Sequence, residues 1–459
     1  MMRLDRTRSA QDLLPAVDRM FELSADKIRS LDSTWRPADG APVFTVRGRY
    51  QSRGWTEWTQ GFQFGSAVLQ FDATGDRECL EAARRATVER MAPHLTHVGV
   101  HDHGFNNVST YGALWRLARE GRYDAEPWEV RCYELALRIS GAVQARRWTR
   151  LEDGGGFIHS FNGPHSLFVD TVRSLRALAL SHALGHRLLE EQDAPVDLLE
   201  RLIQHAQATA RFSVYYGAGR DIYDVRGRVA HESLFNPANG TYRGPNSQQG
   251  YSPFSTWTRG LAWALLGFAE QMEFLQTVPA PELERCGGVE ALGGWMLEAA
   301  RATADFYLDT AAAADGVPYW DTGAPGLEAL GDWGDRPSDP FNAHEPVDSS
   351  AAAIAAQGLL RLGRILPPRE GAKYEQAGLQ VLGTLLDDRG PYLSADPGHQ
   401  GLLLHSIYHR PNGWDHVPEG SSIPRGESSQ WGDYHLRETA LLVRRLATGA
   451  PYLTFFGNR

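Results

Sequence analysis

Apolar residues recur along most of this chain every three to four positions, the spacing that places side chains on one face of an α-helix. Segments with this period, bounded by residues that start and stop helices, predict twelve helices. They fall near residues 11–31, 60–75, 76–94, 107–121, 125–146, 165–185, 194–214, 256–276, 288–312, 349–366, 370–388 and 431–448. Strand patterns are short and weak, with candidates at 42–50 and 221–229, so the pattern predicts a mainly helical protein with hairpin-like loops.

The predicted helices differ in how their polar residues are distributed. Those near 76–94 and 370–388 carry a charged face, whereas those near 256–276 and 349–366 are apolar or small nearly all round. Helices of the second kind are typically buried. Alternation of buried and amphipathic helices over six pairs predicts an all-α (α/α)6 barrel, and the small residues 351–356 would allow close inner packing. No repeat of about 30 to 45 residues is visible, which disfavours a helical solenoid.

Polar and aromatic residues collect at the starts of the even-numbered helices. These residues are Trp58, the run 101–107, Asp170, Trp257, Arg259, Asp348, Trp431 and Asp433. If the inner helices run in the same direction, such positions meet at one mouth of the barrel, where helix N-termini add positive dipole ends. The loop HVGVHDHGFNNVS (97–109) holds many polar groups that are costly to bury without partners, so we expect it to line a cavity.

Composition and charge exclude several classes of function. The formal net charge is −10 and no run of Lys or Arg appears, which argues against nucleic acid or an anionic membrane as a partner. The N-terminal sequence lacks the apolar core of a signal peptide and no window is apolar enough to span a membrane, so a cytoplasmic protein is expected. The three cysteines are too few and too scattered for a disulfide framework or a cysteine zinc site. We expect one domain over 1–459, as a monomer or homodimer.

Five sequence runs, taken in order, resemble those of the unsaturated glucuronyl hydrolases of glycoside hydrolase family 88. They are HDHGF (101–105), STWTRGLAWALLGFA (255–269), YWDTGAP (319–325), DSSAAAIAAQGLL (348–360) and WGDYHLRE (431–438). The resemblance covers about residues 55–448. It implies an (α/α)6 barrel, which the helix pattern predicts independently. It also implies a hydrolase that removes a 4,5-unsaturated uronic acid from the non-reducing end of oligosaccharides left by polysaccharide lyases.

The resemblance also implies catalytic residues. Asp170 resembles the catalytic aspartate of the family, and Asp102 resembles the aspartate of its His-Asp-x-Gly-Phe loop. Because the unsaturated sugar is a vinyl ether, Asp170 would protonate C4 and then help to deprotonate the water that attacks C5, unlike glycosidases that first protonate the glycosidic oxygen. Asp102 would orient sugar hydroxyls and, as a nearby like charge, raise the pKa of Asp170. No metal or cofactor is required.

Further residues match family positions around the unsaturated sugar. The expected substrate-binding residues are His101, His231, Gln249, Trp257, Arg259 and Trp263. The arginine offers planar donors for a carboxylate or hydroxyls, and tryptophan faces suit the C–H face of a pyranose. Gln248 stands where the family often has His, and the segment SLFVDTVRSLRALALSH around Asp170 is less typical than its neighbours. These departures bear on substrate preference.

Spacing alone also allows structural interpretations of the same residues. Asp170 and Arg173 could form a surface ion pair on a helix, and Asp102 with Asn106 and Asn107 could cap the next helix. Both alternatives compete with a catalytic site.

Three further sets of residues also have interpretations other than substrate binding. The aromatic and arginine positions within 257–263 repeat at helical spacing, where aromatics more often belong to a core. His101 and His103 could suggest a metal, but no third ligand stands at a recognisable spacing. We interpret Asp348 as a helix N-cap.

Three other functions remain open at this stage. An unsaturated rhamnogalacturonyl hydrolase would share the barrel and the chemistry. A toroidal polysaccharide lyase or epimerase would use His or Tyr as a base, with candidates at His159, His165, His405 and His409. A non-catalytic carbohydrate-binding toroid is the third. The parent polysaccharide and the tolerance of sulfate depend on loops such as 408–430.

Overall fold

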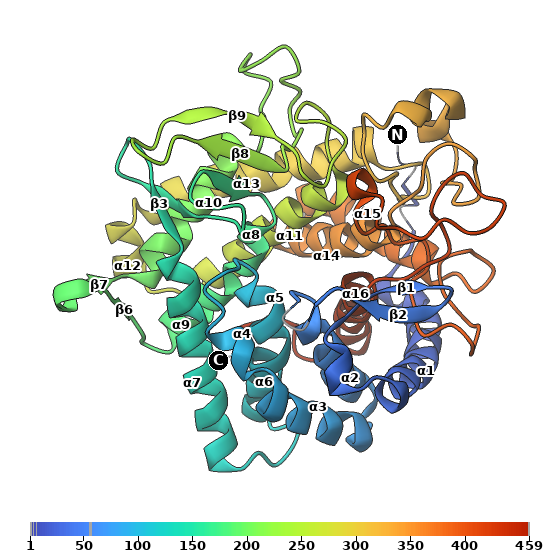
Figure 1. Ribbon diagram of the computed structural model, residues 1–459, viewed down its shortest axis with the longest axis horizontal. Helices are drawn as coiled ribbons and strands as arrows, with labels where there is room; N and C mark the ends of the chain where they lie inside the picture. The colour runs from blue at the N-terminus through green and yellow to red at the C-terminus, as the bar shows by residue number, and fades with distance from the viewer. Residues whose placement is uncertain (1, 3, 6, 55–56, 458–459) are drawn as a thin grey trace.

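Two concentric layers of helices form a barrel in the computed structural model, which describes residues 2, 4–5, 7–54 and 57–457 (Figure 1). The inner layer contains α2 (Gln60–Thr74), α5 (His103–Asn107) continued by a π-helical turn (Val108–Gly112) into α6 (Ala113–Arg119), α8 (Thr171–Ser174) followed by α9 (Arg176–Ala183), α11 (Thr258–Leu275), α14 (Ser349–Ile365) and α16 (Gln430–Thr448). The outer layer contains α1 (Ala10–Thr34), α3 (Arg77–Arg90), α7 (Pro127–Arg146), α10 (Leu198–Phe212), α13 (Val289–Phe306) and α15 (Pro368–Leu386). Two short helices, α4 (Ala92–Leu95) and α12 (Ala280–Arg285), lie in connections.

The inner helices close into a ring. Successive members pack against one another, and α16 packs against α2 to complete the circle. Inner and outer helices alternate along the chain, so the predicted (α/α)6 barrel is confirmed. None of the described helices is long and apolar enough to cross a membrane.

Small residues allow the inner helices to approach closely. The side chains of Ala351–Ala356 are fully buried in α14. Farther along this helix, a β-carbon at Gly358 would lie only 2.9 Å from the backbone nitrogen of Leu266 in α11. Glycine is therefore needed where these two helices cross. The charged faces of α3 and α15 point outward, as their sequence patterns predict.

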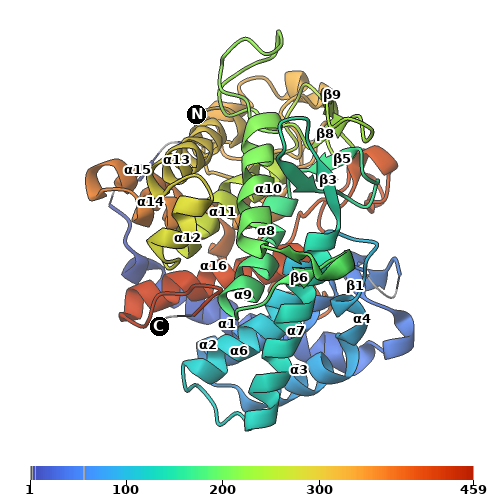
Figure 2. The same ribbon diagram turned by 90° about the vertical axis from the view of Figure 1, so that its left-hand side faces the viewer.

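The connections between the helices contain short antiparallel strands. They are the hairpin β1 (Pro42–Val46) and β2 (Arg49–Ser52), the pair β3 (Trp148–Arg150) and β4 (Gly156–Ile158), the pair β6 (Leu188–Leu189) and β7 (Pro195–Val196), and a sheet in the order β5 (Ser166–Phe168), β8 (Glu232–Phe235), β9 (Tyr242–Asn246). Figure 2 shows β1, β3, β5, β8 and β9 on the same side of the barrel. The strand candidate at 42–50 forms a hairpin, in which β1 and β2 pair across a turn at 47–48.

Three sequence-based assignments are wrong. The helix expected over 107–121 begins at His103, inside the run 97–109 that was expected to be a loop, and continues through a π-helical turn. The helix expected over 165–185 begins only at Thr171, because residues 166–168 pair with β8 as strand β5. The strand expected over 221–229 is a series of turns. There the Asp224 side chain accepts hydrogen bonds from the backbone nitrogens of Gly217 and Arg220, which favours turns over a strand.

Candidate active site

A cavity of about 260 Å³ opens among the N-terminal ends of the inner helices. Its wall consists of Glu57, Trp58, Val100, His101, Asp102, Phe161, Phe168, Asp170, Gln248, Gln249, Trp257, Arg259, Trp263, Tyr408, His409 and Trp414. Seven of the eight residues expected in the site line this wall, and His231 lies behind it. Segments far apart in the sequence are thus brought to one place.

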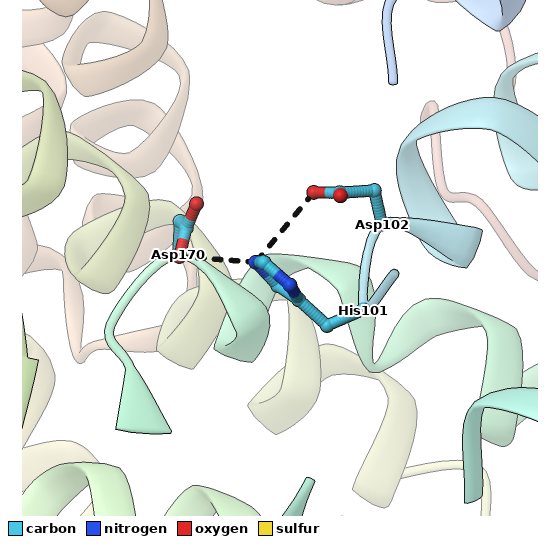
Figure 3. Close-up of side chains that lie close together, drawn as sticks. All are labelled: His101, Asp102 and Asp170. Carbon is cyan, nitrogen blue, oxygen red and sulfur yellow. Dashed lines mark ion pairs between the residues drawn. The ribbon is translucent and has the colours of Figure 1, made fainter. Parts of the chain in front are cut away.

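His101 lies between the two aspartates (Figure 3). Its Nε2 atom is 3.7 Å from Oδ1 of Asp102 and 3.7 Å from Oδ1 of Asp170. Both nitrogens of His101 and Oδ1 of Asp170 are buried and form no hydrogen bond with the described residues. Buried polar atoms nearly always have partners, so these three atoms remain available to a bound ligand.

The loop that carries His101 and Asp102 is fastened directly to α8. The Ser174 hydroxyl donates to the carbonyl oxygen of His101 at 2.8 Å and accepts from the backbone nitrogen of Gly104 at 2.8 Å. Gln144 of α7 donates to the same His101 carbonyl at 2.7 Å. Since α8 starts one residue after Asp170, these bonds fix the separation of the two aspartates.

The pKa of Asp170 is lowered, whereas a raised pKa is expected from the sequence. Burial raises the pKa of Asp102, His101 opposes this effect, and the charge of Asp170 adds to it. Burial also acts to raise the pKa of Asp170, but contact with His101 and the charge of His231 outweigh it, so this pKa is lowered. The expectation that Asp102 raises the pKa of Asp170 is therefore wrong, because an imidazole lies between the two carboxyl groups.

The pKa of His101 is raised despite its burial. Burial alone would lower it, but the attraction of Asp102 and then of Asp170 to the imidazolium is larger. Because the three groups interact strongly, their protons belong to the cluster as a whole. The arrangement can therefore hold and redistribute a proton beside the cavity.

The same three side chains could also bind a cation. One ligand atom from each of His101, Asp102 and Asp170 lies within 4.8 Å of the others. His103 takes no part, because its ring nitrogens lie within hydrogen-bonding distance of the Ser140 hydroxyl and the His97 carbonyl. Of the two histidines that suggested a metal site from the sequence, His101 belongs to this cluster and His103 does not.

Arg259 is held by the protein rather than left free for a ligand. Its Nη1 pairs with Asp348 at 3.0 Å and also donates to the Ile407 carbonyl. Its Nη2 donates to Oε1 of Gln249 at 3.1 Å and to the carbonyl of Tyr408 at 2.7 Å. Both terminal nitrogens therefore have acceptors, and the arginine fixes the part of the wall formed by Tyr408 and Gln249.

Asp348 is a helix N-cap, as expected. Its side chain accepts hydrogen bonds from the backbone nitrogens of Ser350 and Ala351 at the start of α14. It thus combines helix capping with the pairing of Arg259.

His231 supports the wall from behind. Its Nδ1 accepts hydrogen bonds from the backbone nitrogens of Gln248 and Gln249, at 3.0 and 3.3 Å. Burial lowers the pKa of His231 to about 4. The ring is therefore neutral near pH 7, and because Nδ1 accepts, its proton lies on Nε2. Its position fixes the loop that carries the two glutamines.

Trp257 and Trp263 belong both to the core and to the cavity. Trp263 is 1% exposed, with its ring centroid 4.9 Å from that of Phe105. Trp257 precedes α11, and its ring lies 4.6 Å from the Arg259 guanidinium carbon. Both tryptophans are therefore buried in the core and also line the cavity.

The surface ion pair considered for Asp170 and Arg173 is absent. Arg173 is fully buried and pairs with Glu270 of α11 at 2.8 Å and Glu438 of α16 at 2.9 Å. The cap considered for Asp102 is also absent, because its side chain makes no capping hydrogen bond to α5. Of the other polar residues placed at helix starts, Asp433 binds the backbone nitrogens of 402–403 and does not line the cavity.

Several wall residues escaped the sequence analysis. They are Glu57, Phe161 and Phe168, whereas Val100 belongs to the loop 97–109 that was expected to line a cavity, and Tyr408, His409 and Trp414 belong to the loop 408–430 that was expected to affect sulfate tolerance. Most lie in loops that have no periodic pattern and no recognisable motif. Phe161 stacks near His101, with ring centroids 5.9 Å apart, but nothing in its local sequence HSFNGPH indicates that contact.

The sequence matches a known family. The model of Glycosyl Hydrolase Family 88 matches residues 44–285. The chain is 27% identical over 409 residues to the unsaturated glucuronyl hydrolase of Bacillus sp. (strain GL1), covering 86% of this chain and 89% of that protein. It is 25% identical over 447 residues to the unsaturated chondroitin disaccharide hydrolase of Streptococcus pyogenes serotype M1, covering 94% and 91%.

Known structures share the fold. The crystal structure of the unsaturated glucuronyl hydrolase from Bacillus sp. GL1 superposes with a TM-score of 0.68 at 23% identity, covering 97% of this chain and 98% of that one. At this identity the superposition supports the fold alone. Since the family model spans more than half of the sequence, the chain belongs to glycoside hydrolase family 88 and is an enzyme.

Proposed function

We propose that this enzyme is an unsaturated glucuronyl hydrolase, which releases a 4,5-unsaturated uronic acid from the non-reducing end of lyase-generated oligosaccharides. The observation that carries the proposal is the approach of Asp102 and Asp170 to one imidazole inside an aromatic-lined cavity. The names of the relatives from Bacillus and Streptococcus support this substrate class.

The proposed reaction is hydration of a vinyl ether. Asp170 donates a proton to C4, and the positive charge that develops is shared between C5 and the ring oxygen. Water then attacks C5, and its proton passes to the Asp170 carboxylate, which restores the acid. The resulting hemiketal opens to a ketone at C5, and the hemiacetal left at C1 collapses to an aldehyde and releases the leaving sugar.

The protonation state of Asp170 depends on the cluster and on the bound substrate. In the free enzyme the lowered pKa of Asp170 favours its ionised form, while the pKa values of His101 and Asp102 are raised. The carboxylate of the bound uronic acid adds a negative charge, which raises the pKa of nearby carboxyl groups. Substrate binding therefore raises the pKa of Asp170 and favours its protonated form, with Asp102 in the assisting role.

Aromatic and amide groups hold the sugar. Trp257 and Trp263 present apolar faces to the pyranose, and His101 and Gln249 contact its polar groups from the wall. Arg259 and His231 act mainly by fixing Gln249, because both bind to it directly. No step in this scheme uses a metal ion.

The direction in which the ultraviolet absorbance of the substrate changes tests the proposal. A hydrolase of this kind destroys the conjugated double bond of a lyase-generated disaccharide, so its ultraviolet absorbance falls. A lyase acting on a saturated polymer would raise the absorbance, and a binding protein would leave it unchanged. Product analysis with glucuronyl and rhamnogalacturonyl disaccharides separates the two hydrolase activities. Failure to consume any unsaturated disaccharide would contradict the proposal.

A further inference from the structure

The cavity wall is unevenly charged. Among its described residues, Glu57, Asp102 and Asp170 carry carboxyl groups, and Arg259 is the one side chain with a permanent positive charge. Both terminal nitrogens of Arg259 are occupied by protein acceptors. A ligand that enters the cavity therefore meets three acidic groups and no free guanidinium from the wall.

Glu57 differs from the other two acids because it has no partner among the residues that the structure describes. Its carboxylate forms no hydrogen bond or ion pair with any residue that the structure describes, whereas Asp102 and Asp170 both face His101. Burial raises the pKa of Glu57, the charge of Asp102 adds to this effect, and Arg53 opposes it. The two acids Glu57 and Asp102 thus influence each other across the same cavity.

Exposure separates the mouth of the cavity from its floor. Trp263 is 1% exposed and the proposed catalytic groups are buried, whereas Trp414 and Phe161 are 38% and 51% exposed. Glu57 is half-buried, between these extremes. The unsaturated ring must reach the buried aspartates, so the leaving sugar lies toward the mouth, beside the half-exposed side chains.

We infer that Glu57 is a specificity-determining residue, which accepts hydrogen bonds from the hydroxyls of a neutral leaving sugar and disfavours a leaving sugar that carries sulfate. This inference rests on the proposed function and adds the charge class of the leaving sugar to it. Two negative charges brought together without a cation between them repel, and water cannot fully screen them in a partly buried site.

Arg53 is the group that could reverse this preference. Its exposed guanidinium lies over the rings of Phe44 and Trp414, 5.1 and 4.9 Å from their centroids. Its Nη2 donates to the carbonyl of Trp414 at 3.3 Å. These contacts hold Arg53 against Trp414, and Arg53 does not line the cavity. The inference therefore assigns the preference to Glu57. The alternative is that Arg53 binds the sulfate and makes the enzyme prefer the sulfated sugar.

The test compares kcat/KM for two disaccharides with the same unsaturated uronic acid and linkage, whose leaving hexosamine is either unsulfated or 6-sulfated. The wild-type enzyme should prefer the unsulfated disaccharide. Glu57→Gln should shift the ratio toward the sulfated one by roughly tenfold, the size of one unfavourable charge contact at a partly exposed site. Glu89→Gln, which removes the same charge from the exposed surface of α3, should leave the ratio unchanged.

A second measurement needs no variant. Raising the ionic strength should narrow the wild-type preference, because salt screens repulsion between partly exposed charges. An unchanged ratio in Glu57→Gln, or wild-type preference for the sulfated disaccharide that is lost in Arg53→Gln, would overturn the inference while the proposed function stands. If the wild-type enzyme consumed neither disaccharide nor any other unsaturated one, the proposed function would fail, and the inference with it.

Discussion

Gly104 and Ser174 touch through their backbones, and this contact joins the segments that carry the two aspartates. A β-carbon at position 104 would lie 2.2 Å from the carbonyl oxygen of Ser174, closer than any real contact. The glycine of the HDHGF run is therefore required by packing rather than by backbone conformation. The consequence is a fixed distance between Asp102 and Asp170.

Gly104→Ala should therefore damage catalysis. The added methyl group must push the loop away from α8, and misplacement of catalytic groups by about 1 Å costs on the order of 100-fold in rate. We expect kcat to fall by about that factor, measured as loss of ultraviolet absorbance with a lyase-generated disaccharide. The matched control is Gly293→Ala in α13, where a β-carbon meets nothing within 4 Å. Equal activities of the two variants would show that the contact is unimportant.

His101→Gln should move the pH profile. The imidazolium is the principal group that lowers the pKa of Asp170 against the effect of burial, and glutamine carries no charge. The pKa of Asp170 should therefore rise, and the limb of the kcat/KM profile that reports its ionisation should move to higher pH. If this limb of the kcat/KM profile stayed at its wild-type pH in the variant, His101 would not control the ionisation of Asp170.

Asp321 should make folding stability depend on pH. It is buried and accepts hydrogen bonds from the backbone nitrogens of Tyr251 and Gly323, both at 2.8 Å. Burial raises its pKa from 3.8 to about 6. Its contribution is therefore fully favourable below about pH 4 and is lost as pH rises toward about 6, by on the order of 1–3 kcal/mol.

Asp321→Asn removes this titration. Urea unfolding at several pH values should show the variant gaining stability relative to the wild type as pH rises from about 4 to about 6. A stability difference that stays constant across this window would contradict the raised pKa.

Metal ions should inhibit rather than activate. His101, Asp102 and Asp170 have the geometry to bind a cation, but ligation would require both carboxylates to be deprotonated and would remove the proton that the proposed reaction uses. Treatment with a chelator should leave the rate unchanged, and micromolar zinc should lower it. Loss of activity on chelation, restored by a divalent cation, would contradict the proton-transfer scheme.

The barrel could be predicted because its helices carry local signals. The apolar period identified twelve segments, and the small residues in 351–356 indicated an inner helix that the structure confirms. Strand β5 was missed because its three residues are stabilised by pairing with β8, more than sixty positions later. Local sequence does not contain that information.

The cavity was predictable where residues stand next to a helix start. Asp102, Asp170, Trp257 and Arg259 were found in this way, whereas Phe161 and Trp414 lie in irregular loops. The pKa order was wrong because chain position says nothing of the distance from His101 to Asp170. Similarly, the spacing of Asp170 and Arg173 suggested a surface pair, although Glu270 and Glu438 bind the arginine from distant helices.

Replacement of one carboxyl group tests the central proposal most directly. The measurement is the decay of ultraviolet absorbance of an unsaturated disaccharide with the wild-type enzyme, Asp170→Asn and, as the charge-matched control on the exposed surface, Asp388→Asn. The account predicts that Asp388→Asn matches the wild type, whereas Asp170→Asn binds the disaccharide but consumes it about 100 to 10,000 times more slowly. Turnover by Asp170→Asn at the wild-type rate would contradict the account.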